Sequence, residues 1–299
     1  MSAPLYRDFL TQAELDREYD VEGSVADFAS YRERFEAASR EAIAQLKPHL
    51  RVPYGPTRAE YLDLYESGAE GGPVLVYFHG GYWRMLASED FAFAARGPVA
   101  NGITVVNVNY ALCPTVTIDE IVRQARAAVA WTYRTIARHG GNPGRLYVGG
   151  HSAGAHLAAM CLVTRWSEDY GLPDDLLRGG ALVGGLYDLR PLPYTFVQPQ
   201  LQLDWGQILR NSPTLSARRT LGGPLLIAYG ERETSEFRRQ SRAFADAWAE
   251  AGNAAPRVLI QDGADHFSSA LEMFETGSWL TRALAELVAG PQAQLASSA

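Results

Sequence analysis

The chain is poor in the residues that build thiolate metal sites, disulfide scaffolds and nucleic-acid surfaces. It has two cysteines among 299 residues, Cys113 and Cys161, and so few thiols predict neither a disulfide framework nor a thiolate metal site. Lysine and arginine together number 27 against 34 aspartates and glutamates, which gives a net charge of -7. The basic residues form no cluster larger than an isolated pair, such as 218–219 and 238–239. We therefore expect no nucleic-acid partner.

The N-terminal segment lacks the features of a leader or a membrane anchor. Residues 1–20 contain acidic side chains and no apolar core, whereas a signal peptide or a spanning helix requires one. We expect a cytoplasmic protein with no membrane partner. The remaining composition, 47% hydrophobic and 20% charged, is that of an ordinary globular protein, with enough apolar material for one large α/β domain or two small ones.

Short apolar runs alternate along the chain with amphipathic segments, which predicts an α/β fold with a mostly parallel sheet and helices on both faces. The expected strands are 61–66, at an edge, then 73–78, 103–110, 146–148, 180–186, 224–229 and 257–260. The expected helices are 11–19, 25–46, 88–96, 116–137, 153–164, 236–251 and a closing group within 267–289. Three prolines in residues 48–57 predict a connector, and Gly97-Pro98 predicts a helix end.

We expect residues 1–290 to form a single domain. The first 50 residues precede the strands and predict a helical cap or side wall. Residues 187–214 are rich in proline and aromatic residues, which predicts an irregular pocket insertion with one short helix near 204–209. The small-residue tail 291–299 predicts disorder.

The most informative stretch is 145–160, in which an apolar run ends in glycines and turns at once into a helix-forming segment. Its centre reads Gly-His-Ser-Ala-Gly and matches G-x-S-x-G, in which a serine occupies a strained turn between a strand and a helix. Glycines two before and two after Ser152 are needed because the turn leaves no room for a Cβ. Ser152 is therefore the predicted nucleophile; the alternative is a serine that merely caps the helix.

A second glycine motif, His-Gly-Gly at 79–81, directly follows the apolar run 73–78. Backbone amides that carry no side chain approach a substrate oxygen closely. We therefore expect the amides of Gly80, Gly81 and Ala153 to bind the oxyanion that forms during acyl transfer. The alternative is a simple tight turn.

The side chains of this loop have separate expected roles. His79 is expected to brace the loop rather than to transfer protons. Tyr82 and Trp83 are candidates for the acyl or leaving-group pocket and, equally, for the core. Arg84 is a candidate partner for a substrate carboxylate, or else a surface residue.

A serine hydroxyl needs a base to attack a carbonyl, and the base needs a group that orients it. In chains with this serine turn, the acid and then the histidine follow the serine. Two histidines follow Ser152. His156 lies one turn along the same helix, where it cannot easily reach the hydroxyl, so we expect a structural role. His266 follows the last expected strand in a polar loop and is the predicted base.

The acid is expected just after strand 224–229, where the loop offers three glutamates. Glu231 is too close to the strand, and Glu236 already begins a helix, where it favourably meets the helix dipole. We therefore predict Glu233. Asp265 adjoins the base, but neighbours in sequence point in different directions, so we expect it to stabilise the loop.

Several motifs taken together resemble a known family. HGGYW, GHSAGAHLAAM, GLYDLRPL, RNSP, EFRRQS and ADHF occur in this order within Val52–Phe267, as in kynurenine formamidase (arylformamidase) and its bacterial esterase relatives in the α/β-hydrolase superfamily. The resemblance implies the α/β-hydrolase fold, with Ser152, Glu233 and His266 as nucleophile, acid and base. The chain departs from the animal formamidases in carrying glutamate where they have aspartate.

The resemblance implies hydrolysis of N-formyl-L-kynurenine to L-kynurenine and formate, through an acyl-enzyme on Ser152. An aryl or short-chain ester would satisfy the same machinery, so a general carboxylesterase is one alternative. A noncatalytic ligand-binding protein on a hydrolase fold is an alternative of another class. The expected partner is a small amide or ester, bound by a monomer or homodimer. No cofactor and no metal are expected, because no histidine and carboxylate cluster has metal-ligand spacing in the sequence.

Overall fold

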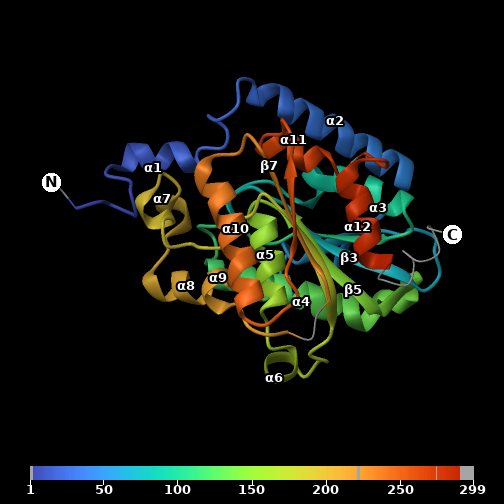
Figure 1. Ribbon diagram of the computed structural model, residues 1–299. Coiled ribbons are helices and arrows are strands. Elements are labelled where there is room, and N and C mark those ends of the chain that lie inside the picture. Colours follow the sequence, from blue (N-terminus) through green and yellow to red (C-terminus); the bar gives the residue numbers. More distant parts are fainter. Residues whose placement is uncertain (1–2, 221–222, 274, 290–299) are drawn as a thin grey trace.

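The centre of the fold is a sheet of eight strands in the computed structural model, which describes residues 3–220, 223–273 and 275–289 (Figure 1). The strands are β1 (His49–Pro53), β2 (Tyr61–Tyr65), β3 (Gly72–Phe78), β4 (Thr104–Val108), β5 (Gly141–His151), β6 (Leu177–Val183), β7 (Leu225–Gly230) and β8 (Arg257–Gln261). Their order is β1-β2-β4-β3-β5-β6-β7-β8. β2 runs antiparallel to β1 and β4, and the other neighbours are parallel. The predicted fold class, a mostly parallel sheet, is confirmed.

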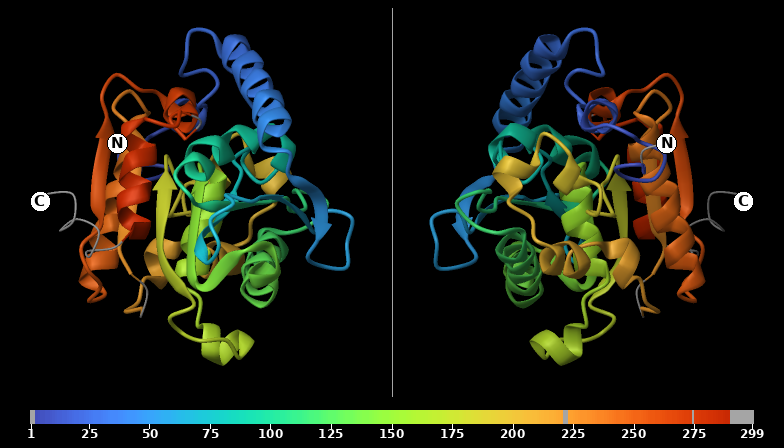
Figure 2. Two further views of the ribbon diagram at one scale, coloured as in Figure 1. Left: turned by 90° about the vertical axis from the view of Figure 1, so that its right-hand side faces the viewer. Right: turned by 90° about the vertical axis from the view of Figure 1, so that its left-hand side faces the viewer.

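Helices cover both faces of this sheet. Side chains alternate along a strand, so in β3 Val76 packs into one core, whereas Leu75 and Tyr77 pack into the other. The longer helices over the first core are α4 (Ile118–Thr135), α5 (Ala153–Leu162) and α10 (Ser235–Glu250). Those over the second are η1 (Ser88–Ala95), α3 (Arg96–Ala100), α11 (His266–Leu271) and α12 (Trp279–Ala289), with α2 (Phe28–Leu46) packed on η1 (Figures 1 and 2).

The remaining helical elements are short and lie mostly outside these layers. They are α1 (Gln12–Tyr19), η2 (Ile136–His139), α6 (Trp166–Tyr170), η3 (Leu192–Tyr194), α7 (Gln198–Leu201), α8 (Trp205–Arg210) and α9 (Pro213–Ser216). Within the described ranges, no helix combines the length and the apolar character that crossing a bilayer demands.

The antiparallel edge of the sheet differs from the prediction. The three prolines of residues 48–57 predict a connector, but β1 forms there and pairs with β2. Pro53 is tolerated because it ends an edge strand, where its missing amide leaves no ladder bond unmade. As a result β2 is an inner strand rather than the predicted edge, and all five of its residues are buried.

Two helix boundaries were also predicted wrongly. Pro98 does not end the helical segment, because it lies in the first turn of α3, where an amide has no partner within the helix. α2 starts after Asp27 rather than after Ser24, since the Asp27 carboxylate accepts the Ser30 amide at 3.0 Å. The Ser24 hydroxyl instead donates to the Val21 carbonyl.

The remaining differences concern where strands begin and end and how many short helices form. β5 begins at Gly141 rather than Leu146, and β6 ends at Val183 rather than 186. α6 was not predicted, and residues 187–214 contain three short helical elements and the start of a fourth, α9, where one was expected. The predicted disordered tail, 291–299, lies outside the described residues.

Candidate active site

Ser152 occupies the turn between β5 and α5. Its backbone has φ 57° and ψ -122°, which costs free energy in an L-residue and persists only where the surroundings enforce it. A Cβ on either Gly150 or Gly154 would collide with the carbonyl oxygen of Phe78, at the end of β3. The Ser152 amide donates to the carbonyl of Val183, at the end of β6, over 2.9 Å. The turn is therefore fixed between the ends of two strands that flank β5.

Glu233 and His266 lie side by side at the same end of the sheet. Glu233 follows β7; its Oε1 accepts the amide of Gly230 at 3.0 Å, and its Oε2 lies 3.0 Å from Nδ1 of His266. The two residues are only 3% and 2% exposed. Because an ionised carboxylate only accepts hydrogen bonds, Nδ1 carries the proton and Nε2 of the neutral ring keeps a lone pair. A general base needs this protonation pattern.

The other three carboxylates considered in the sequence are engaged elsewhere. Glu231 is exposed and accepts a loop amide, that of Gly263. Glu236 is buried and paired with Arg239, whose Nε lies 2.6 Å from its Oε1. Asp265 caps α11 and accepts the Tyr31 hydroxyl at 2.7 Å. Its expected role in stabilising the loop is confirmed.

His151 is a further residue of the site, and no expectation from the sequence included it. Its ring lies 4.5 Å from that of His266, centroid to centroid, and its Nε2 lies 2.8 Å from the His266 carbonyl oxygen. A carbonyl only accepts, so Nε2 carries the proton. Burial, and next the neighbouring His266 ring, hold the pKa of His151 well below its ordinary value. His151 therefore stays neutral and fixes the backbone of His266; its place before the serine in the pentapeptide was the available signal.

The glycine loop after β3 lies against the serine turn. A Cβ on Gly80 would come within 3.3 Å of the Cβ of Ser152. Gly81 has φ 111°, in the region that favours glycine, and a Cβ there would collide with the Met85 carbonyl. In the part of the chain that the structure describes, the amides of Gly80, Gly81 and Ala153 have no protein acceptor. These amides are thus free to bind a ligand oxygen.

His79 braces this loop, as expected. Its Nδ1 lies 2.7 Å from the carbonyl oxygen of Gly80, and its ring stacks on Tyr110 with centroids 4.1 Å apart. The Tyr110 hydroxyl also donates to the His79 carbonyl. Complete burial lowers the pKa of His79 to about 4. A neutral, fully enclosed ring is consistent with support of the loop rather than with proton transfer to a substrate.

The three residues after the glycine loop divide between the cavity and its surroundings. Tyr82 lines the cavity. Trp83 does not: it is fully buried in the core, edge-on to His156 with centroids 4.9 Å apart. Arg84 also lies outside the cavity lining, because its guanidinium hydrogen-bonds to Gln200. For Trp83 the structure therefore favours the alternative of a core residue, and Arg84 does not line this cavity.

His156 has the structural role that was expected. It is fully buried on α5, and its Nε2 donates to the carbonyl oxygen of Asn211 over 2.7 Å. Burial lowers the pKa of this ring to about 4, so it remains neutral. The bond ties the serine-bearing helix to the segment before α9.

The serine and the histidine face one cavity of about 470 Å³. Its other wall is formed by α2, which lies across the end of the sheet toward which the parallel strands point (Figures 1 and 2). The aromatic residues of the lining are Phe28, Tyr31, Phe35, Tyr82, Phe91 and Phe267, and the charged ones are Glu22, Arg32, Glu36 and Asp90. Residues 187–214 contribute nothing to this lining. The predicted pocket insertion therefore does not line this cavity; one of its residues, Phe196, lies against Tyr82, with ring centroids 6.4 Å apart.

Comparison with known proteins agrees with this fold. The model of a family described as having the alpha/beta hydrolase fold matches residues 75–267. The kynurenine formamidase of Danio rerio is 35% identical over 245 residues, which cover 79% of this chain and 80% of that protein. The esterase LipQ of Mycobacterium tuberculosis is 27% identical over 78% of this chain and 63% of its own. A solved structure of a proposed thioesterase from Silicibacter sp. tm1040 has a TM-score of 0.80 and 26% identity, covering 91% of this chain and 99% of that one.

Proposed function

The chain belongs to the α/β-hydrolases, and within them to the kynurenine formamidase-like proteins, so it is an enzyme that acts on a formamide or an ester. We propose that it cleaves an aryl formamide with Ser152 as nucleophile. The candidate reaction converts N-formyl-L-kynurenine and water to L-kynurenine and formate. The observation that carries this proposal is the 3.0 Å distance between Oε2 of Glu233 and Nδ1 of His266, together with the cavity that both His266 and Ser152 line.

The proposed mechanism uses these groups in turn. His266 takes the hydroxyl proton as the Ser152 oxygen attacks the formyl carbon. The carbonyl oxygen becomes an oxyanion that the amides of Gly80, Gly81 and Ala153 stabilise. When the tetrahedral intermediate collapses, His266 passes its proton to the leaving aniline nitrogen and the formyl group stays on the serine. Water, deprotonated by His266, then attacks the formyl ester, and the serine leaves with that proton as formate departs.

Two charged residues of the cavity support a substrate with an amino-acid head group. Arg32 and Glu36 are one turn apart on α2 and both line the cavity, so a cation and a carboxylate face the same space. A guanidinium pairs with a carboxylate, and a glutamate pairs with an ammonium group. The aromatic side chains around them suit the aryl ring of the substrate. A plain ester offers neither of the charged groups that these two side chains would bind.

The test compares kcat/KM for N-formyl-L-kynurenine and for p-nitrophenyl acetate, with the wild type and Ser152→Ala. We expect a strong preference for the formamide and a loss of at least about 10³-fold on both substrates in the variant, since the nucleophile is removed. Organophosphate labelling of the wild type, absent in Ser152→Ala, would report the serine independently of the substrate. A folded wild-type sample that neither turns over nor reacts with the label would sink the serine mechanism.

A general carboxylesterase is the second candidate. The observation that favours it is the similarity to the esterase LipQ, together with a cavity large enough for more than a formyl group. Serine-dependent turnover of the ester without turnover of the formamide would establish this alternative and leave the mechanism unchanged.

A further inference from the structure

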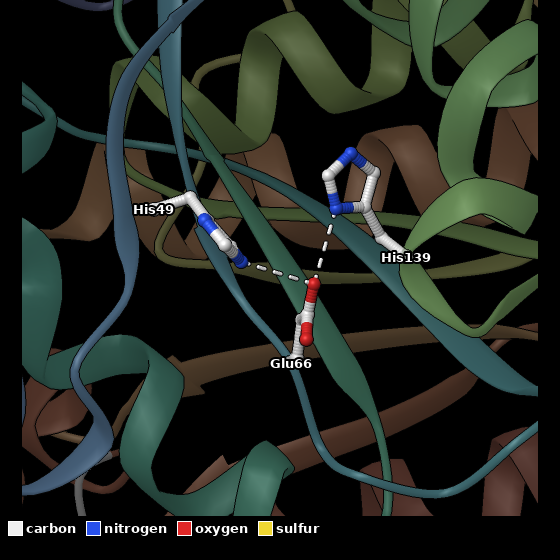
Figure 3. Close-up of side chains that lie close together, drawn as sticks. All are labelled: His49, Glu66 and His139. Carbon is white, nitrogen blue, oxygen red and sulfur yellow. Dashed lines mark hydrogen bonds and ion pairs between the residues drawn. The ribbon is translucent and has the colours of Figure 1, made fainter.

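Two histidines and a glutamate from segments far apart in the sequence converge at the surface (Figure 3). The Oε1 atom of Glu66 lies 3.2 Å from Nε2 of His49 and 3.1 Å from Nδ1 of His139. All three ligand atoms lie within 4.8 Å of one another. The lack of metal-ligand spacing in the sequence therefore does not exclude a histidine and carboxylate cluster in the fold. Sequence spacing could not reveal this cluster, because the fold alone brings the three segments together.

We propose that this cluster binds a zinc ion. Zinc takes imidazole nitrogen and carboxylate oxygen at roughly 2.0–2.2 Å in a tetrahedron, so neighbouring ligand atoms are about 3.3–3.5 Å apart. The two separations from Glu66 are close to this value, and the histidines need only a modest side-chain rotation to approach each other. Three protein ligands leave a fourth position for water. Nitrogen donors disfavour magnesium and calcium, which prefer oxygen ligands.

The backbone on either side of the cluster is already fixed. His49 begins β1 and Glu66 directly follows β2, and these two strands are paired. His139 ends η2, and the next residue, Gly140, accepts the Gly71 amide over 2.7 Å, which ties this turn to the segment after β2. Little backbone order remains to be gained on binding, so the entropic cost of assembling the site is small.

The side chains are accessible to solvent, and their contacts with one another are compatible with metal binding. Their exposures are 58% for His49, 41% for Glu66 and 26% for His139, so an ion can enter from solvent. Without metal, Nδ1 of His139 donates a hydrogen bond to the shared carboxylate oxygen, and Nε2 of His49 lies 3.2 Å from the same oxygen. With metal, each ring moves its proton to the other nitrogen, and the freed lone pairs bind zinc. No residue has to be added and no buried group has to move.

The cluster lies at the end of the sheet opposite Ser152. β2 runs antiparallel to β4, and its last residue, Tyr65, pairs with Val105 near the start of β4. Ser152, by contrast, follows the carboxyl end of β5. Zinc here would cross-link the β1-β2 hairpin to η2 and would not contact the reacting atoms. We therefore infer a stabilising site, separate from hydrolysis.

The experiment titrates chelator-treated protein with zinc chloride by calorimetry and records the melting temperature with and without zinc. We expect one zinc ion per chain and a higher melting temperature in zinc, because the ligand binds only the folded state. His49→Ala and His139→Ala should each weaken binding by at least about tenfold. Glu70→Gln, a nearby exposed carboxylate, is the matched control for Glu66→Gln and should bind as the wild type does.

Two outcomes would overturn the proposal. One is equal zinc affinity in the wild type and in both alanine variants, which would mean that zinc binds elsewhere, for example near His266. The other is no binding by the wild type under conditions in which the control dye-chelator titration works. Circular dichroism and unchanged hydrolysis in the variants establish that they are folded.

Discussion

At the scale of single residues, the surroundings of the candidate site tightly constrain where the Glu233 carboxylate and the His266 ring can lie. The carboxylate of Glu233 receives one backbone amide and one imidazole nitrogen, and Gly184 leaves room for both, because a Cβ there would lie 2.9 Å from Glu233 and 3.2 Å from His266. Any side chain at position 184 would therefore displace the carboxylate or the imidazole.

Glu233→Gln should lower kcat/KM by roughly 10³- to 10⁴-fold. The amide keeps the shape of the side chain but donates a hydrogen bond, which favours the imidazole tautomer with its proton on Nε2, and this nitrogen then cannot accept the serine proton. Steady-state kinetics with the preferred substrate measures the effect. Glu231→Gln, two residues away and exposed, should remain within about twofold of the wild type. A Glu233→Gln variant that keeps most of its activity would remove Glu233 from the mechanism.

At the scale of elements, the sequence predicted the parts of the site that follow strands and missed the part that comes from a helix. Ser152, Glu233 and His266 lie just beyond apolar runs, and parallel strands bring their carboxyl ends to one edge, so their convergence was predictable. The role of α2 was not, because its aromatic residues both pack on η1 and Phe267 and line the cavity, beside Arg32 and Glu36. Periodicity reports which face of a helix is apolar, and not which element it meets.

Arg32→Gln on α2 should raise KM for N-formyl-L-kynurenine by roughly tenfold or more, because a charge-assisted hydrogen bond to the substrate carboxylate is lost. Hydrolysis of p-nitrophenyl acetate should change by less than about twofold. Arg40→Gln, an exposed residue of the same helix that does not line the cavity, is the control and should affect neither substrate. Equal losses on both substrates in Arg32→Gln would point to a disturbed helix instead of a lost contact.

At the scale of the whole molecule, the fold encloses imidazoles that remain neutral. His79 and His156 are fully buried, and burial lowers the pKa of each to about 4. In the unfolded chain the same rings take up protons near their ordinary value of 6.5. The unfolded state therefore binds more protons than the folded state below about pH 6.5, so acid favours unfolding. Each ring contributes stability that is fully present above that pH and is lost as the pH falls toward 4.

The free energy of unfolding should accordingly decrease between about pH 6.5 and pH 4, by up to ~3 kcal/mol for each of these two histidines. Urea unfolding at pH 7.5, 6, 5 and 4.5 measures it. His156→Gln keeps a donor for the Asn211 carbonyl and removes one titrating ring, so its stability should fall less steeply with acid. A variant whose slope matches the wild type would exclude His156 from the acid sensitivity.

The position of α2 in the chain has a consequence for how such enzymes diverge. The family model matches residues 75–267, which include Ser152, Glu233, His266 and the glycine loop. The wall that carries Arg32 and the aromatic residues of α2 lies before that segment. In the proposed mechanism, the reacting groups and the α2 side of the cavity therefore come from different stretches of the chain. Substitutions before residue 75 can change what this side of the cavity accepts without touching the reacting groups.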